Sequence, residues 1–165
     1  MWRALLLLCW LAVAAWPTAG QAQVQRIRAA QVAVGLGPGF PQAGGEPTAL
    51  PDEWARSRPD HAGPLWYRAA FDAPALPPGE LLALRVEQVC SNLAVQLNGQ
   101  LVYTNGRLTS PVTDNCNHPQ LVLLPAGLLK DKGNTLDLLV TGFPLAQSAS
   151  RQRAGFLSEL VLGPQ

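Results

Sequence analysis

A polar segment over residues 103–120 concentrates side chains that could recognise a ligand. It carries amides, hydroxyls, a carboxylate, an imidazole and a guanidinium, from Asn105, Arg107, Thr109, Asp114, Asn115, Asn117 and His118. Asn and Asp also cap turns with their own side chains, and this structural role explains Asn105 and Asn115 at least as well. Arg107 and Asn117 are therefore the residues of this segment that we expect to bind a small polar ligand.

Two arginines near the C-terminus form a second candidate site. Arg151 and Arg153 flank Gln152, and two guanidinium groups can together bind a carboxylate, a phosphate or the hydroxyls of a sugar. The alternative is a strand edge whose arginines face water or pair with Glu159 and Asp137. The sequence leaves both interpretations open, so both arginines stay candidate ligand-binding residues.

Aromatic side chains could add a stacking surface for a sugar ring. Trp54, Trp66 and Tyr67 lie close together in the sequence. Aromatic residues at such positions more often pack in a core or between sheets. We expect Tyr67 to pack internally, and we keep Trp54 as a candidate ligand-stacking residue.

Catalytic chemistry has little support in this sequence. The chain holds two histidines, His61 and His118, both in segments expected to be loops. No serine lies in a nucleophile elbow, and no His-Glu-x-x-His motif is present. A glycosidase needs two carboxylates across a sugar; the carboxylates available are Asp52, Asp60, Asp114 and Glu159. A small β domain would need a deep cleft between two of them, so we expect no enzyme and no cofactor.

The N-terminus reads as a cleavable signal peptide. Arg3 precedes an apolar run over residues 4–16, and the small residues Gly20 and Ala22 follow. This pattern is typical of export, with cleavage expected after Ala22. The apolar run is shorter than the roughly 20 residues that span a bilayer, although an uncleaved anchor is the alternative. We expect a periplasmic or secreted protein.

The charge balance excludes several classes of partner. The chain has 12 basic and 11 acidic residues, and cleavage after Ala22 removes Arg3, which leaves 12 − 1 = 11 basic residues against 11 acidic ones. A neutral domain lacks the basic surface that binds nucleic acid or anionic lipid. We therefore expect no nucleic-acid partner and no direct membrane insertion after cleavage.

Two cysteines, Cys90 and Cys116, remain after the expected cleavage. An even pair in an oxidising compartment predicts a disulfide. The alternative is a metal site that uses both cysteines with His118, but this spacing matches no zinc pattern. The disulfide would tie the polar segment to a neighbouring strand and hold its side chains ready for binding.

Period-two alternation of apolar residues dominates the rest of the chain. It predicts strands over residues 24–34, 65–71, 81–89, 93–97, 101–103, 120–124, 136–140 and 156–162. Asn98-Gly99 predicts a type I′ hairpin turn, and residues 125–130 suit a single helical turn. The Gly/Pro-rich residues 35–51 predict a surface segment without regular structure. Together these patterns indicate an all-β fold, a single β-sandwich.

Three stretches resemble the sugar-binding modules of family 2 glycoside hydrolases, which are galactose-binding-like jelly rolls. They are residues 50–71, with Leu-Pro-Asp-Glu-Trp and Gly-Pro-Leu-Trp-Tyr-Arg, the hairpin over 92–102, and residues 133–138. The resemblance runs from about residue 50 to residue 162. It implies a galactose-binding-like sandwich over 50–165. The expected signal peptide over 1–22 and an N-terminal strand with the Gly/Pro-rich segment over 23–49 precede this domain.

Other segments resemble the extracytoplasmic input domains of bacterial sensor histidine kinases. These are residues 107–113, 115–120 and 151–155. The resemblance implies a non-catalytic, ligand-sensing role in membrane signal transduction, with a receptor or kinase as partner. Such receptors continue into transmembrane helices and a signalling domain, whereas this sequence stops at Gln165. We expect a stand-alone relative, a truncated one, or part of a longer product.

The sequence thus favours an extracytoplasmic module that binds a small polar ligand or a partner protein. A carbohydrate-binding module is the first alternative, and a structural domain that docks on a membrane partner is the second.

Overall fold

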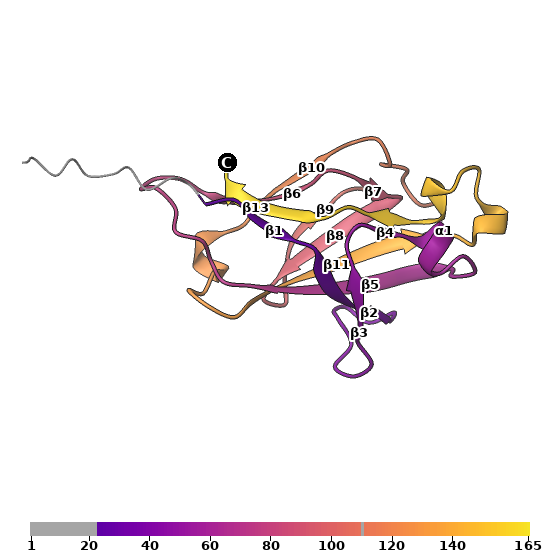
Figure 1. Cartoon of the computed structure of the whole chain (residues 1–165), viewed down its shortest axis with the longest axis horizontal. Helices are drawn as coiled ribbons and strands as arrows, with labels where there is room; N and C mark the ends of the chain where they lie inside the picture. The colour runs from indigo at the N-terminus through magenta and orange to yellow at the C-terminus, as the bar shows by residue number, and fades with distance from the viewer. Residues whose placement is uncertain (1–22, 110) are drawn as a thin grey trace, which may run out of the picture.

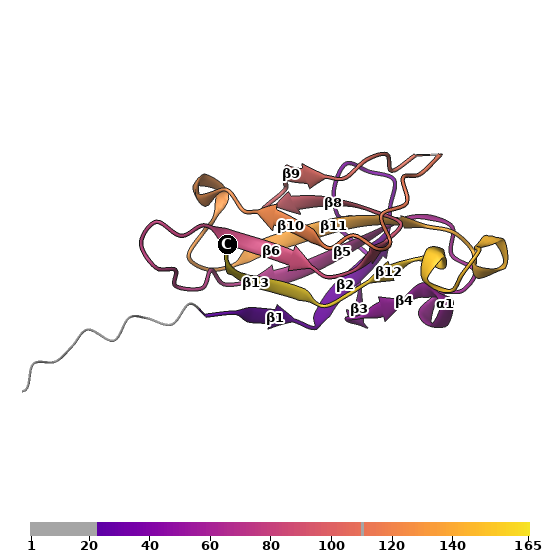
Figure 2. The same cartoon turned by 90° about the horizontal axis from the view of Figure 1, so that it is seen from above.

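Buried and exposed side chains alternate along the strands and so build a two-layered sandwich. The computed structural model describes residues 23–109 and 111–165, and the expected signal peptide lies outside them. Within these residues the strands form a six-stranded, a four-stranded and a three-stranded sheet. Figures 1 and 2 show an elongated molecule with α1 gathered at one end and the C-terminus toward the other.

The six-stranded sheet is antiparallel between all neighbouring strands. Its central pair is the longest in the fold and runs in register over its full length. The strand order is β3 (Glu46–Ala49), β2 (Ala29–Val34), β5 (Gly63–Phe71), β11 (Asn134–Gly142), β8 (Asn92–Leu97) and β9 (Gln100–Thr104).

The other two sheets cover and extend this first layer. The four-stranded sheet has the order β1 (Gln25–Ile27), β13 (Leu160–Pro164), β6 (Leu82–Val86) and β10 (Gln120–Leu123). The three-stranded sheet has the order β4 (Asp52–Glu53), β12 (Phe156–Leu157) and β7 (Val89–Cys90). Four short helical segments are α1 (Trp54–Ser57), η1 (Ala126–Leu128), η2 (Leu145–Gln147) and η3 (Gln152–Ala154).

The core lies between the six-stranded and four-stranded sheets. Along β5, Leu65, Tyr67, Ala69 and Phe71 all belong to it, as expected for a strand with one face turned inward. Leu84 of β6 and Leu138 of β11 are fully buried in the same cluster. The expected packing role of Tyr67 is therefore confirmed, and so is the all-β sandwich.

Most predicted strands are present, but their boundaries differ. The stretches 24–34, 81–89 and 156–162 each divide into two strands. The Gly/Pro-rich segment was expected to lack regular structure, yet it ends in β3. Pro47 is tolerated there because β3 is an edge strand, where a missing N–H breaks no ladder. Residues 23–49 are also integral to the sandwich, since β1 pairs with β13 and β2 with β5.

No helix within residues 23–109 and 111–165 combines the length and the apolar character needed to cross a membrane.

A buried polar network links α1 to the core. The indole Nε1 of Trp54 donates to the Tyr67 hydroxyl at 2.6 Å, and that hydroxyl donates to Asp52 Oδ2 at 2.7 Å. Arg58 Nη2 and Ser57 Oγ complete the carboxylate's partners, each at 2.6 Å. Burial raises the pKa of Tyr67, and the nearby charge of Asp52 raises it further. The phenol therefore stays protonated and donates continuously to the carboxylate.

Tyr67→Phe tests this network. Loss of the hydroxyl leaves the buried Trp54 N–H without its acceptor, which should cost about 1–3 kcal/mol of unfolding free energy. The pH dependence should change as well. Because the pKa of Tyr67 is raised in the folded state, its phenol stabilises the fold fully below the ordinary pKa of 10.0. This contribution to the free energy of unfolding is lost as the pH rises above that value. The free energy of unfolding, measured with urea from pH 7 to pH 11, should fall less steeply at alkaline pH in the variant than in the wild type. Equal pH dependences in the two proteins would contradict this.

Candidate functional site

A disulfide anchors the polar segment to the end of the sandwich, as predicted. Cys90 of β7 and Cys116 are joined with their Cα atoms 4.4 Å apart, and both residues are buried. The backbone N–H of Asn115 donates to the carbonyl of Ser91 at 2.8 Å beside the bridge. Because both sulfur atoms are consumed, the alternative of a metal site with His118 is excluded in this oxidised form.

Side-chain amides hold the same segment from inside. Asn92 is fully buried, and its Nδ2 donates to the Arg107 carbonyl at 2.8 Å. Asn115 Nδ2 donates to Asn92 Oδ1 at 3.2 Å and to the Asn105 carbonyl at 3.1 Å. The amide of Asn115 thus has the structural role that was the alternative to binding.

The second candidate segment, η3, is fixed against Trp54. The backbone N–H of Trp54 donates to the Gly155 carbonyl at 3.0 Å, and that of Phe143 donates to the Ala154 carbonyl at 2.9 Å. Gly155 has φ of 145°, and a Cβ there would lie 2.2 Å from Trp54 Cδ2. A Cβ on Gly142 would lie 2.2 Å from the Ala154 carbonyl oxygen. Only glycine permits this close packing.

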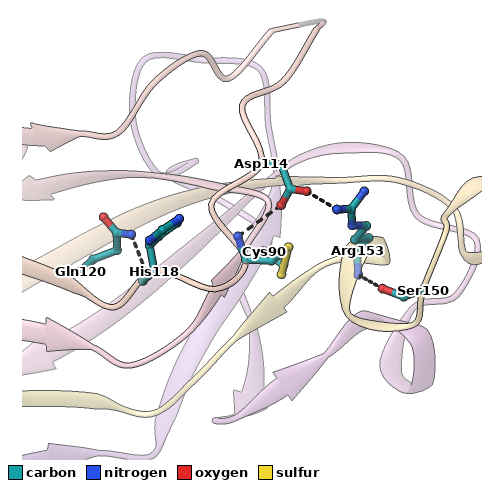
Figure 3. Close-up of a disulfide and its surroundings, with 7 residues drawn as sticks. Cys90, Asp114, His118, Gln120, Ser150 and Arg153 are labelled. Carbon is teal, nitrogen blue, oxygen red and sulfur yellow. Dashed lines mark hydrogen bonds and ion pairs between the residues drawn. A yellow bond between two sulfur atoms is a disulfide. The ribbon is translucent and has the colours of Figure 1, made fainter.

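The two candidate segments meet in an ion pair. Arg153 Nη2 lies 2.7 Å from Asp114 Oδ2, and Asp114 Oδ1 accepts from the Cys116 N–H at 3.2 Å. Figure 3 shows Arg153 reaching from its turn to Asp114, next to the disulfide. The sequence did not predict this pairing, although it singled out both segments.

A hollow of about 310 Å³ opens beside this pair, and we call it the loop-end pocket. Phe143, whose exposed fraction is 39%, supplies an aromatic surface. Asp114 and Arg153 supply acceptors and donors whose charges cancel. The pocket is lined by Ser91, Val112, Asp114, Phe143, Gln147, Ser148, Ala149 and Arg153. An aromatic ring beside paired donors and acceptors suits a neutral ligand rich in hydroxyl groups.

Arg153 and Arg151 have separate partners and form no common clamp. Arg151 Nε lies 3.2 Å from Glu53 Oε1, away from the loop-end pocket. The pairing expected as the alternative, with Glu159 and Asp137, is not found, because these carboxylates bind other arginines. Both arginines also lie in or beside a 3₁₀ turn instead of at a strand edge.

The remaining candidates lie outside the pocket lining. Arg107 and Asn117 are exposed, and the main chain of Arg107 closes the loop with Thr113 through bonds of 2.9 and 3.1 Å. The expectation that Trp54 stacks on a ligand is wrong. Its side chain has no exposed surface, so it cannot offer a ring face to a sugar, and it supports η3 instead.

Sequence reasoning missed Phe143, Gln147 and Ser148. Phe143 directly follows the strand that ends at Gly142 and precedes Pro144. An aromatic residue between a strand end and a proline is a usable signal for an exposed loop residue. The position of η2 next to η3, which completes the pocket, depends on tertiary packing and leaves no local pattern.

Most of the potential catalytic groups have structural partners. His61 packs edge-on against Trp54 with ring centroids 5.1 Å apart, and desolvation lowers its pKa. Three of the four carboxylates considered, Asp52, Asp114 and Glu159, are held in ion pairs with arginines. In the part of the chain that the structure describes, no group of three or more His, Cys, Asp or Glu side chains could hold a metal ion.

Comparisons with known proteins support the fold. No protein-family model and no curated protein matches the chain. Among solved structures, a Faecalibacterium prausnitzii β-glucuronidase is 17% identical with a TM-score of 0.61, covering 91% of this chain and 33% of that chain. An uncultured Clostridium sp. β-glucuronidase is 15% identical with a TM-score of 0.61, covering 91% and 30%. A glycosyl hydrolase family 2 member from Bacteroides cellulosilyticus DSM 14838 is 14% identical with a TM-score of 0.61, covering 86% and 20%.

These similarities confirm the β-sandwich and agree with the family 2 resemblance at the level of the fold. The chain spans only 20% to 33% of those three proteins, so it corresponds to one part of each. The resemblance to receptor input domains is not tested by these neighbours and stays a prediction.

Cys90→Ser is expected to lower the melting temperature by about 7 °C or more. Closing a loop with a sequence separation of 26 removes roughly 3.5 kcal/mol of unfolded-chain entropy in the loop model, and domains of this size shift by about 2–8 °C per kcal/mol. Differential scanning calorimetry of the exported protein measures the shift. Cys116→Ser removes the same disulfide from its other end and should lower the melting temperature by the same amount. A melting temperature unchanged in both variants would show that the bridge does not stabilise the fold.

Proposed function

We propose that this protein is a non-catalytic, extracytoplasmic binding module that recognises a small, neutral, sugar-like ligand in the loop-end pocket. The observation that carries the proposal is the Arg153–Asp114 pair beside Phe143, in a hollow of about 310 Å³. A ring with hydroxyl groups can stack on Phe143 while its hydroxyls bind both members of the ion pair.

Pre-organisation supports binding at this place. The disulfide and the Asn92 and Asn115 amides fix one wall of the pocket, and the packing of Trp54 on Gly155 fixes the other. A ligand therefore orders few groups on binding, which preserves affinity. The buried disulfide also favours an oxidising compartment, in agreement with the expected periplasmic or secreted location.

The position of the receptor-like segments favours a sensory role. Residues 107–113 and 151–155 supply Val112 and Arg153 to the lining of the loop-end pocket. Residues 115–120 supply Cys116, whose backbone N–H donates to the pocket residue Asp114. The segments that resemble glycoside hydrolase modules instead lie mainly in the strands of the six-stranded sheet. We infer that the ligand-binding end is of the receptor input type, with a membrane receptor or kinase as partner. A carbohydrate-binding module that serves a hydrolase is the second candidate, and the shared fold supports it.

A thermal-shift screen against neutral sugars, organic acids and phosphates tests the proposal. The full chain is exported to the periplasm of a bacterial host, so that the disulfide can form, and is then purified. A neutral sugar should raise the melting temperature with increasing concentration, and a concentration 100-fold above Kd stabilises by about 2.7 kcal/mol. Retention on insoluble polysaccharide would favour the hydrolase-associated module over the receptor domain.

Variants locate the binding site. Phe143→Ala and Arg153→Ala should each raise the ligand concentration needed for a given shift in melting temperature by about tenfold. This corresponds to a loss of about 1.4 kcal/mol of binding free energy. Arg151→Ala is the matched control, because it removes a guanidinium that points to Glu53. Arg107→Ala tests the earlier candidate. If the shift persists in Arg153→Ala and Phe143→Ala, the pocket assignment is wrong; a flat screen on folded protein would favour the docking domain.

A further inference from the structure

The outer face of the six-stranded sheet carries a transverse row of polar side chains. Gln31 of β2 is in register with Arg68 of β5, Arg68 with Asp137 of β11, and Asp137 with Gln96 of β8. All four point away from the core, since the neighbouring residues along each strand belong to the core cluster. Such a row is unrelated to the loop-end pocket. Asp137 lies five residues before Gly142 on β11, roughly 17 Å from the strand end that leads to Phe143.

Arg68 is held rigidly at the centre of this row. Its Nε and Nη2 atoms bind the two oxygens of Asp137 at 2.7 Å each, and its guanidinium carbon lies 4.4 Å from the centroid of the Phe40 ring. The carboxylate of Asp137 is 2% exposed, whereas the side chain of Arg68 is 35% exposed. Trigonal geometry directs the third nitrogen, Nη1, away from Asp137. The exposed donor is thus fixed in place before any ligand arrives.

A hollow of about 380 Å³ lies beside this arginine. It is lined by Ala29, Ala30, Gln31, Arg68 and Ala70. Ala29 and Ala70 present small apolar side chains, so the backbone of β2 and β5 can be approached closely. Gln31 adds an amide with both a donor and an acceptor on the side of Arg68 opposite to Asp137.

We propose that this hollow is a second binding site, for one neutral sugar residue, with Arg68 and Gln31 as its hydrogen-bonding groups. Asp137 cancels the charge of Arg68, so the site offers directed N–H donors without a net attraction for anions. The two alanines accept the C–H face of a sugar ring. Paired charges with a residual donor, a neighbouring amide and a small apolar floor together match a polyhydroxylated neutral ligand better than an acid or a phosphate.

Titration of the exported full chain with soluble neutral oligosaccharides tests this site. Isothermal titration calorimetry measures the binding, because the hollow has no aromatic residue in its lining. Ala70→Leu fills the hollow from an exposed position and should weaken binding by about tenfold or more; Gln31→Ala should weaken it by about three- to tenfold. Ala62→Leu is the matched control, since Ala62 is exposed and lies outside the hollow.

Phe143→Ala separates this site from the loop-end pocket. Oligosaccharide binding that persists in Phe143→Ala and is lost in Ala70→Leu supports the second site. This holds even if the loop-end pocket binds no ligand. Binding that is lost only in Phe143→Ala overturns the second site and leaves the proposed function intact. The second site is also overturned if no neutral oligosaccharide binds, if only acidic ligands bind, or if Ala70→Leu and Gln31→Ala both bind as the wild type does.

Discussion

The packing of one buried indole determines the shape of the end of the sandwich that holds the proposed binding site. Trp54 fits against Gly142 and Gly155, where no Cβ could be accommodated, and its N–H is bound by Tyr67. Tyr67 in turn donates to Asp52, which also accepts from Arg58, the residue directly after α1. A buried carboxylate without these partners would be strongly destabilising. The short helix, the strand β5 and the turn η3 are therefore fixed together, and Arg153 takes its position from them.

The two arginine–aspartate pairs illustrate how burial changes the role of the same interaction. Arg153 and Asp114 are 54% and 41% exposed, so their mutual attraction is screened and worth about 0–1 kcal/mol. A ligand can share or rearrange this pair at little cost. Asp137 is almost fully buried, and Arg68 donates a hydrogen bond to each of its carboxylate oxygens. Its hydrogen bonds raise the pKa of Arg68, and the pair acts as one rigid neutral unit.

Local patterns in the sequence predict much of the fold, because strand alternation and turn chemistry are local properties. The alternation in residues 65–71 becomes β5, and Asn98-Gly99 has φ of 50° and 83°, as a type I′ turn requires. The Cys90–Cys116 bridge was also predictable from the number of cysteines. Residue type alone misleads for Trp54, because an indole suits both a core and a sugar platform. Ion-pair partners such as Arg151 and Glu53, 98 positions apart, depend on tertiary structure and have no local signal.

The charge balance makes contact geometry, and not long-range attraction, the basis on which the proposed sites would select a ligand. The whole chain has a formal net charge of +1, and its charges are largely consumed in pairs between neighbouring elements. A nearly neutral surface gives no long-range attraction to draw in a charged partner. Affinity must therefore come from groups that are already in position when the ligand arrives. The disulfide-anchored loop, the Trp54-supported turn and the Phe40-stacked arginine each fulfil this condition through a different covalent or packing constraint.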